Sequence, residues 1–340
     1  MTPRLDIHFT LSQHISFFWG KPYTPEENEF LLNHARSGIL LALESLHLPK
    51  GSRIGVMAYN CHTVFNAVAQ AGCELEFIDV TKDLLIDLID LKAKSNNLRA
   101  LVVTHLFGIQ NDITAIRDIL PHLPIIEDCA HAYGSTDGAV GDFSVFSIGQ
   151  GKLPSVGDGG ILMVNNNIYL KEAQRLYATL PEYSGLAELK LFGKLWLRAF
   201  SNIPLIYSLF TVPLKNQRRI SSGIERIHLK KMSRGIQRLY EIEKKRVASS
   251  IEKRIQKTQY RIESADKKNV QFIYGSNAFM LIALCDDPII LKTHFMNLGL
   301  ETATHFGRCI EWAGSFGYKS GVCPTAEFLT KHLLMIPTYK

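Results

Sequence analysis

The sequence predicts an α/β protein, with a large domain built on a mainly parallel central sheet and a smaller C-terminal α+β domain. Near-continuous apolar runs recur through the first half of the chain, and amphipathic segments separate several of them. This alternation is typical of a parallel sheet that helices cover on both faces. After residue 227 a long basic segment is followed by a separate set of strand-like and helix-like runs.

The apolar runs of the first half are the expected strands. They are Arg53–Tyr59, Glu74–Val80, Ala100–Phe107, Leu123–Ala130, Ser144–Gly149 and Gly159–Val164. The expected helices between them are Gly38–Leu46, Val64–Gly72 and Asp112–Leu120. Since ligands of such sheets bind beyond the carboxyl ends of the strands, functional residues are expected just after these runs.

The second half follows a different pattern. The alternation stops over residues 168–226, and Ile227–Lys257 is expected to form one long basic amphipathic helix. A strand at Phe279–Asp286, a helix ending near Gly299 and a last apolar element at His332–Pro337 follow. We therefore predict a first domain over residues 1–226, with 168–226 as a divergent segment, and a second over 227–340.

Composition excludes several classes of protein. The net charge of +6 suits anionic ligands but is too small to indicate DNA binding. The six cysteines form no CxxC pair, which argues against a zinc site or a disulfide scaffold and favours a cytoplasmic protein without a bound metal. The N-terminus has charges where a secretory signal needs an apolar region, and the uncharged run Ala199–Leu214 is too short to span a membrane.

Four residues at expected strand and helix ends fit the needs of one cofactor. Pyridoxal phosphate (PLP) requires a lysine for a Schiff base, an acid for its pyridine nitrogen and a cradle for its phosphate. Lys152 and Asp128 follow neighbouring strands, Ser37 opens a helix, and Ser147 lies five residues before Lys152. Each alone has an ordinary explanation, as a surface lysine, a helix cap or a turn. Their order and placement favour the cofactor, and no GxGxxG motif supports a nicotinamide enzyme.

Several longer segments resemble the DegT–DnrJ–StrS family of PLP-dependent sugar aminotransferases, which have the fold type I architecture. The resemblance covers about Arg36 to Asn167 and, more weakly, Met232 to the end. It is carried by "ARSGILLALESLHLPKGSRIGVMAYNCHTVFNAVAQAGCELEFIDV", "VVTHLFGIQNDITAI", "LPIIEDCAHAYGS", "GDFSVFSIGQGKLPSVGDGGILMVNN", "MSRGIQRLYEIEKKR" and "GLETATHF". The resemblance implies a homodimer that moves an amino group from an amino acid, usually glutamate, to a keto-sugar that is often nucleotide-linked.

The resemblance also implies roles for individual residues. Lys152 corresponds to the lysine that forms the Schiff base, and Asp128 to the acid that holds the pyridine nitrogen. The other implied cofactor-binding positions are Ser37 and Gly38 in the phosphate turn, Ser147 as a further phosphate ligand, His131 near the phenolic oxygen, and Cys61 or His62, with Tyr59 in reserve, where an aromatic usually stacks on the ring. One subgroup has histidine in place of the lysine and is a sugar dehydratase, so Lys152 favours transamination.

Two departures from the family pattern leave alternatives open. At the matching segment Leu229–Met232 the family has an asparagine that contacts the partner's cofactor phosphate; here His228, Lys230 or Lys231 are candidates for the same contact. This difference and the divergent segment 168–226 keep open a non-catalytic or regulatory relative that binds a sugar nucleotide or a partner.

The divergent segment itself has two interpretations. Lys190, Lys194 and Arg198 have helical spacing, and Arg218 and Arg219 follow the uncharged run. Residues 190–219 are thus a candidate for peripheral membrane contact. The alternative is a dimer-interface or site-covering segment that buries Leu195, Trp196 and Phe200.

Overall fold

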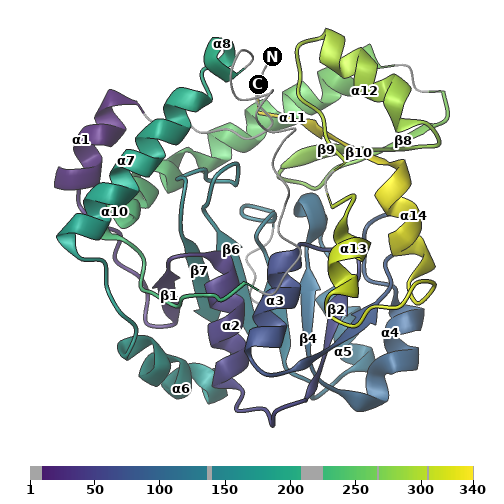
Figure 1. The fold of residues 1–340 in the computed structure, drawn as a ribbon, viewed down its shortest axis with the longest axis horizontal. Coiled ribbons are helices and arrows are strands. Elements are labelled where there is room, and N and C mark those ends of the chain that lie inside the picture. The colour runs from purple at the N-terminus through teal and green to yellow at the C-terminus, as the bar shows by residue number, and fades with distance from the viewer. Residues whose placement is uncertain (1–9, 136–139, 208–224, 266–267, 305, 340) are drawn as a thin grey trace.

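The computed structural model describes residues 10–135, 140–207, 225–265, 268–304 and 306–339 (Figure 1). Its strands are β1 (Glu29–Leu32), β2 (Arg53–Met57), β3 (Glu74–Ile78), β4 (Leu98–Thr104), β5 (Ile125–Asp128), β6 (Phe143–Ser147), β7 (Gly160–Val164), β8 (Val270–Ile273), β9 (Met280–Cys285) and β10 (Leu333–Pro337). Its helices are α1 (Leu11–Trp19), α2 (Ala35–Ser45), α3 (His62–Gln70), α4 (Leu88–Lys94), α5 (Ile113–Ile119), α6 (Asn167–Ala178), α7 (Gly185–Ser201), α8 (Pro204–Ile206), α10 (Arg234–Glu243), α11 (Val247–Ser264), α12 (Pro288–Asn297), α13 (Cys309–Gly314) and α14 (Pro324–His332).

The large sheet has seven strands in the order β1-β7-β6-β5-β4-β2-β3. Five neighbouring strands of this sheet, β6, β5, β4, β2 and β3, pair in parallel, whereas β7 is antiparallel to both β6 and β1. All six expected strands of the first half are therefore confirmed, and the mainly parallel sheet with them. Thr104 pairs with Asp128, and Asp128 with Val145, so the carboxyl ends of β4, β5 and β6 meet at one edge.

Helix α2 is held close to the sheet by two glycines. A Cβ atom on Gly160 of β7 would lie 2.3 Å from the backbone nitrogen of Ala35, and one on Gly38 would lie 2.9 Å from Val145 of β6. Neither position has room for a larger side chain, so the start of α2 rests directly on the sheet. This contact fixes where the free N–H groups of its first turn lie.

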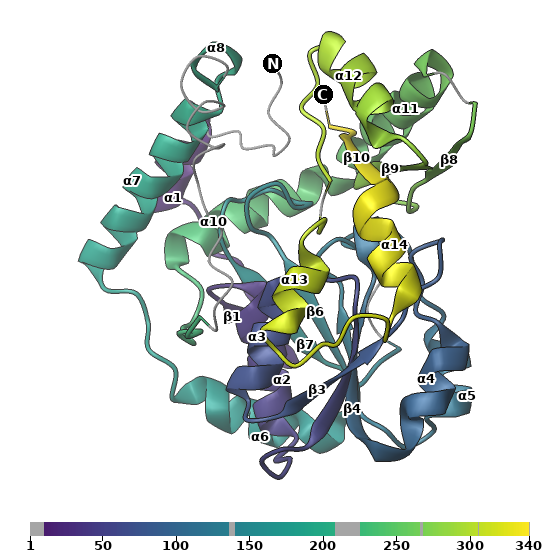
Figure 2. The same cartoon turned by 45° about the vertical axis from the view of Figure 1, so that its right-hand side comes forward.

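A second, antiparallel sheet of order β10-β9-β8 forms the C-terminal part of the molecule. The expected strand, helix and last apolar element correspond to β9, α12 and β10, and Gly299, with a φ of 77°, follows α12. Figure 2 shows this sheet with α11 and α12 above the large sheet, and α13 and α14 between the two sheets. The division at residue 226 stays a prediction.

The single long helix expected at Ile227–Lys257 is wrong in its start and in its continuity. Residues 225–233 are not helical; Met232 donates its N–H to Leu31 on the edge of the large sheet. Ser233 then caps α10, and a 3₁₀ turn at Lys244–Arg246 separates α10 from α11. Both helices bury an apolar side against the rest of the protein, so the apolar pattern continues across the turn and does not reveal it.

The segment 168–226 contains helices that the alternation of the first half does not predict. Asn166 caps α6 and Ser184 caps α7, each through its side chain. Leu191 and Leu195 of α7 are buried with Phe17 of α1 and Leu239 of α10 in a small apolar core. No helix of the described residues is long and apolar enough to cross a membrane.

Candidate active site

A cavity of about 640 Å³ opens at the carboxyl ends of the parallel strands. Its walls come from the first turns of α2 and α3, the ends of β4, β5 and β6, the loop 149–152, and segments of the C-terminal part. The sequence-predicted residues that line it are Cys61, His62, Asp128, His131, Ser147 and Lys152. Six residues that are distant in the sequence are therefore brought together where parallel-sheet proteins bind ligands.

Asp128 ends β5 and is 4% exposed. Its Oδ1 accepts the N–H of Ala130 at 3.1 Å, and its Oδ2 accepts the hydroxyl of Thr104 at 3.2 Å. Thr104 in turn accepts a hydrogen bond from Nδ2 of Asn60 at 2.8 Å. Burial raises the pKa of the Asp128 carboxyl, while Ala130, the charge of Lys152 and Thr104 act to lower it. The chain Asn60–Thr104–Asp128 thus fixes the orientation of a buried carboxylate at the cavity.

Lys152 lies half-buried in the same cavity. Burial lowers the pKa of its ammonium group, against the opposing charges of Cys61 and Asp128. Its Nζ lies 5.6 Å from the ring centroid of Phe279, a residue of the C-terminal part. A lysine with a lowered pKa beside a buried carboxylate is suited to act as a nucleophile and as a proton carrier.

The start of α2 holds the two residues that were expected in the phosphate turn, Ser37 and Gly38. Ser37 is fully buried: its N–H donates to the carbonyl of His34 and its hydroxyl donates to Oδ1 of Asn33 at 2.8 Å. Gly38 faces Val145, and neither residue lines the cavity. Because successive helix positions turn by about 100°, the first-turn residues Ala35 and Arg36 line the cavity instead.

His34, the N-cap residue of α2, is paired with Asp158 at the same wall. The two atoms, Nδ1 and Oδ1, are 2.8 Å apart. Burial acts to raise the pKa of Asp158, but the hydrogen bond and charge of His34 outweigh it and leave the pKa below its ordinary value. This pair joins the start of α2 to the turn that follows Lys152.

Ser147 ends β6 and is 8% exposed within the cavity. Its hydroxyl is 3.5 Å from the N–H of Gly149. Beyond Lys152, Gly157 and Gly159 have φ values of 102° and 107°, a region that favours glycine. These two residues let the chain turn back from Lys152 into β7.

Cys61 is the N-cap residue of α3 and lines the cavity beside His62. Its Sγ accepts the hydroxyl of Thr63 at 3.1 Å and is 3.9 Å from Nδ1 of His62. Burial acts to raise the pKa of the thiol, but His62 and Thr63 outweigh it, so the pKa lies below its ordinary value. The His62 ring packs edge-on against Trp312 at 5.0 Å.

His131 is buried and stacked on aromatic rings. Its centroid is 4.6 Å from that of Phe279 and 5.5 Å from that of Phe107, with interplanar angles of 17° and 20°. The N–H of Phe107 donates to its Nδ1 at 3.2 Å, so the ring proton lies on Nε2. The imidazole is therefore oriented as a hydrogen-bond donor through Nε2.

Several cavity residues were not predicted from the sequence. They are Asn60 and Thr104 behind Asp128, Ala35 and Arg36 at α2, and Phe279, Phe306, Arg308 and Trp312 of the C-terminal part. Thr104 and Arg36 sit within quoted motifs, and their positions at a strand end and a helix start were the available signals. Nothing in the local pattern of the C-terminal residues indicates that they meet the large sheet.

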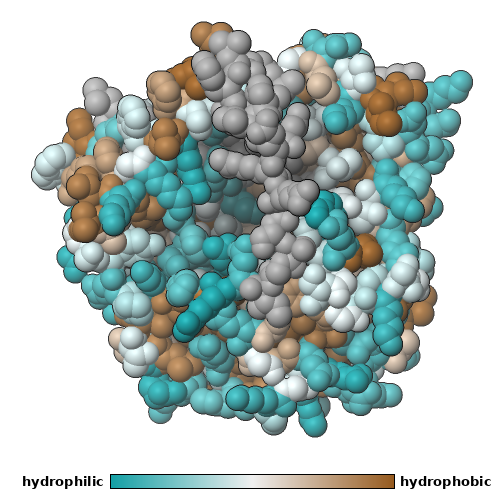
Figure 3. Space-filling model, in the orientation of Figure 1, coloured by the Kyte–Doolittle hydropathy of each residue, from teal (hydrophilic) through white to brown (hydrophobic). Residues whose placement is uncertain are grey.

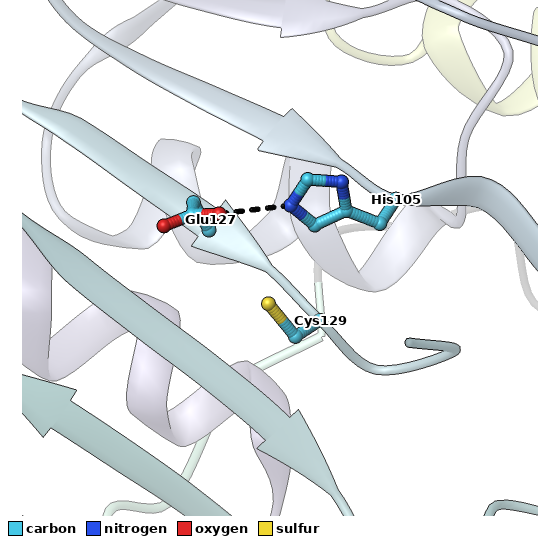
Figure 4. A group of neighbouring side chains, drawn as sticks. All are labelled: His105, Glu127 and Cys129. Carbon is cyan, nitrogen blue, oxygen red and sulfur yellow. Dashed lines mark hydrogen bonds and ion pairs between the residues drawn. The ribbon is translucent and has the colours of Figure 1, made fainter. Parts of the chain in front are cut away.

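The opposite side of the same strand ends holds a second polar cluster, His105, Glu127 and Cys129 (Figure 4). Nε2 of His105 is 3.0 Å from Oε2 of Glu127, and both side chains are 1% exposed. Nδ1 of His105 accepts the N–H of Asn111, and Oε1 of Glu127 accepts the N–H of Gly141. The three side chains could ligate a metal by type and spacing, but both nitrogens of His105 are engaged in hydrogen bonds. We assign the cluster a structural role, joining β4 and β5 to the loop before β6.

The residues expected to replace the family asparagine lie at the edge of the large sheet. Asn33 donates to the carbonyl of His228 at 2.9 Å and accepts the N–H of Lys230 at 3.3 Å. The Lys231 ammonium is 3.1 Å from Glu182, and that of Lys230 lies 5.7 Å from the centre of the Tyr183 ring. None of the three lines the cavity within this chain.

The outer side of α7 is apolar. Leu195 is buried, as one interpretation of this segment expected, but Trp196 and Phe200 are 49% and 46% exposed. Apolar side chains gather over α1 and α7 and again over α8 in Figure 3. Residues 208–219, including Arg218 and Arg219, lie outside the described residues.

The sheet order and the cavity define the class of protein. The fold is that of an aminotransferase from Streptoalloteichus hindustanus, with a TM-score of 0.74, 16% identity and coverage of 100% of this chain and 94% of the other. A neighbour from Streptococcus pneumoniae, solved in its PLP form, has a TM-score of 0.73 and 14% identity over 100% of this chain and 93% of its own; it is also known in a PMP form. These are fold type I aminotransferases, and the predicted fold class is confirmed.

The sequence places the chain in one family of that class. Residues 23–340 match the model of the DegT/DnrJ/EryC1/StrS aminotransferase family, so the chain belongs to this family. GDP-perosamine synthase of Vibrio cholerae is 30% identical over 145 residues, which are 40% of this chain and 40% of that protein. The transaminase of dTDP-3-amino-3,4,6-trideoxy-α-D-glucose from Micromonospora megalomicea is 28% identical over 46% of this chain and 43% of its own. The chain thus spans about two fifths of these curated relatives.

Proposed function

We propose that the protein is a PLP-dependent aminotransferase that moves an amino group from an amino acid, with glutamate as the donor, to a nucleotide-linked keto-sugar. The observation that carries the proposal is the presence of Lys152 and the buried Asp128 in one cavity at the strand ends. Family membership supports the reaction class. The relatives' names, which include GDP- and dTDP-linked sugars, support the acceptor and a place in the synthesis of amino sugars or surface polysaccharides.

The residues of the cavity fit the cofactor by the chemistry of their donor groups. Lys152 would hold PLP covalently through its amine, and Asp128 would hold the pyridine nitrogen. Backbone N–H groups of Ala35 and Arg36, the Arg36 guanidinium and the Ser147 hydroxyl would hold the phosphate at the start of α2. A volume of about 640 Å³ is ample for the cofactor and a sugar.

Each of these side chains then has a chemical task. The bound cofactor supplies the electron sink that makes the α-carbon of the donor acidic. Nζ of Lys152 takes the proton from that carbon and returns it, which its lowered pKa favours by making the neutral amine available. Asp128 would hold the pyridine nitrogen in its protonated form, and Nε2 of His131, which carries the ring proton, would be available as a donor to the phenolic oxygen.

A non-catalytic relative is the second candidate. The absent family asparagine favours it, since none of the residues expected to replace it lines the cavity within this chain. The Asn60–Thr104–Asp128 chain opposes it, because a binding protein has no need for a carboxylate held in this way beside a lysine. We therefore favour the enzyme.

A half-reaction tests the proposal. Wild-type protein mixed with PLP should develop the visible absorbance of the attached cofactor, and glutamate should convert it to the amine form. Borohydride reduction followed by peptide mass spectrometry should locate the cofactor on Lys152. Lys152→Ala should lose both signals, and Lys171→Ala, on the exposed side of α6, should keep them. A wild-type protein that acquires no attached cofactor would overturn the proposal.

We also propose a homodimer in the cytoplasm. The exposed apolar outer side of α7 and the exposed Trp19 of α1 support a contact between copies. Peripheral membrane contact through residues 190–219 is the alternative for the same surface, with Lys190 and Lys194 beside it. The Trp196→Ser variant distinguishes the two contacts. If the surface is a dimer contact, light scattering should show the mass of a monomer. If it is a membrane contact, the mass should be unchanged, and co-sedimentation should show weaker binding to anionic vesicles.

A further inference from the structure

A second cavity of about 370 Å³ adjoins the loop that carries Lys152. It is bounded by residues 152–155, by Gln13 of α1, and by the junction of α10 and α11 from Glu243 to Arg254. Lys152 is the residue common to the walls of this cavity and of the larger one. We call it the basic cavity.

The charged side chains of this wall are mostly positive. Arg246, Lys253 and Arg254 line it, against a single carboxylate, Glu243. Nη1 of Arg246 is 2.9 Å from Oε1 of Glu243, and the same oxygen accepts a hydrogen bond from Gln13 at 2.8 Å. The remaining excess of positive charge lies in a concave site, which concentrates the field and attracts anions.

Hydroxyl groups complete the wall. Ser155, Ser249 and Ser250 line the cavity, and Ser155 accepts the N–H of Gly151 at 3.1 Å. Guanidinium, ammonium and hydroxyl groups together are the set that binds phosphate oxygens. The volume is near the lower end of ligand sites, so it suits a diphosphate better than a whole nucleotide sugar.

Phe279 links the basic cavity to the active site. Arg254 is 4% exposed, and its Nη1 donates to the carbonyl of Phe279 at 3.1 Å and to the hydroxyl of Thr338 at 3.2 Å. The Phe279 ring lies beneath the Lys152 ammonium and stacks on His131. An anion held by this wall is therefore close to Lys152 and His131, to which we assign roles in the reaction.

We propose that the basic cavity binds the phosphate-bearing part of the keto-sugar acceptor and so selects phosphorylated or nucleotide-linked sugars over free ones. The inference rests on the proposed aminotransferase function and names a subsite for its second substrate. The amino donor, whose anionic groups are carboxylates and not phosphates, binds in the larger cavity. The basic cavity is thus the specificity site and the larger cavity the reaction site.

The test uses inorganic pyrophosphate and UDP as probes on the PLP-loaded protein. Calorimetric titration should detect both, with affinity that falls steeply as salt is raised. Lys253→Gln and Arg246→Gln, both exposed residues whose loss spares the core, should each weaken the binding of both probes about tenfold or more. Lys292→Gln, which removes the same charge from the exposed side of α12, should bind as the wild type does.

Glutarate distinguishes the phosphate site from a donor-carboxylate site. Binding of this dicarboxylate should be unchanged in Lys253→Gln, and UDP should not slow the glutamate half-reaction. Unchanged pyrophosphate and UDP binding in both variants would overturn the proposal, as would competition between UDP and glutamate. If glutamate converts no cofactor in the wild type, the proposed function fails, while the probe titrations still report on the basic cavity by themselves.

Discussion

Glu127 and Asp128 are adjacent carboxylates at the end of β5, yet they serve opposite sides of the sheet. Glu127 does not line the cavity; it bonds to His105 (Figure 4), and it also meets the N–H of Gly141 and the hydroxyl of Ser144. Asp128 points into the cavity and has Thr104, Ala130 and the charge of Lys152. Both are almost fully buried. Burial alone therefore does not distinguish the two carboxylates: we assign the chemistry to the side that has a cavity and a lysine, and stability to the closed side.

The largest expected effect is that of Asp128→Asn on the chemistry. We expect the glutamate half-reaction to slow about 10³-fold, because the amide cannot hold a protonated pyridine nitrogen. The unfolding free energy should fall by only about 1 kcal/mol, since the amide oxygen can still accept from one of the two donors, Thr104 or Ala130. Stopped-flow absorbance and urea denaturation measure the two quantities. A rate of the half-reaction within tenfold of the wild-type rate would contradict the role that we assign to Asp128.

Glu127→Ala should have the reverse profile. It leaves the donors of His105, Gly141 and Ser144 without an acceptor in a buried site, which should lower the unfolding free energy by about 3 kcal/mol. Glu127→Gln is the control, since its amide oxygen still accepts hydrogen bonds and should preserve more of the stability. Urea midpoints give the result. An alanine variant as stable as the wild type would remove the structural role that we assign to this side.

His62→Gln should change the reactivity of Cys61, on the side of the sheet that has the cavity. His62 lowers the pKa of the Cys61 thiol, so in the wild type the reactive thiolate forms at a lower pH than in a free cysteine. Without the imidazole the pKa of the Cys61 thiol should rise, and the pH at which iodoacetamide alkylates it should rise with it. Cys61→Ser protein gives the background from the other cysteines. Superimposable pH profiles would contradict the assignment.

The smallest effect is expected at Cys129, on the closed side. Cys129→Ala removes one buried sulfur and should lower the unfolding free energy by about 1 kcal/mol. Added zinc should leave the thermal midpoint of the apoprotein unchanged, because the His105 nitrogens are engaged in hydrogen bonds. A zinc-dependent rise in the midpoint that Cys129→Ala abolishes would instead identify a metal site.

The parallel sheet and the grouping of several predicted residues at its edge were predictable from the sequence. Buried strands need apolar residues along their whole length, and the residues that follow them meet at one edge, so Asp128, Ser147 and Lys152 were predictable from order alone. Cys61, His62 and His131 were predicted through motifs. These signals are local or depend only on the topology of the sheet.

Two features of the cavity depend on how the chain packs: which residue of each motif lines it, and which C-terminal residues complete its wall. Successive helix residues are rotated by about 100°, so Ala35 and Arg36 line the cavity, whereas Ser37 and Gly38, two positions later, do not. The break between α10 and α11 was hidden by an apolar pattern that continues through it. Phe279, Trp312 and the basic cavity depend on how the C-terminal part packs against the large sheet. Contacts over such sequence separations leave no periodic signal, because each side chain is compatible with its own segment and acquires its role only when the two parts meet.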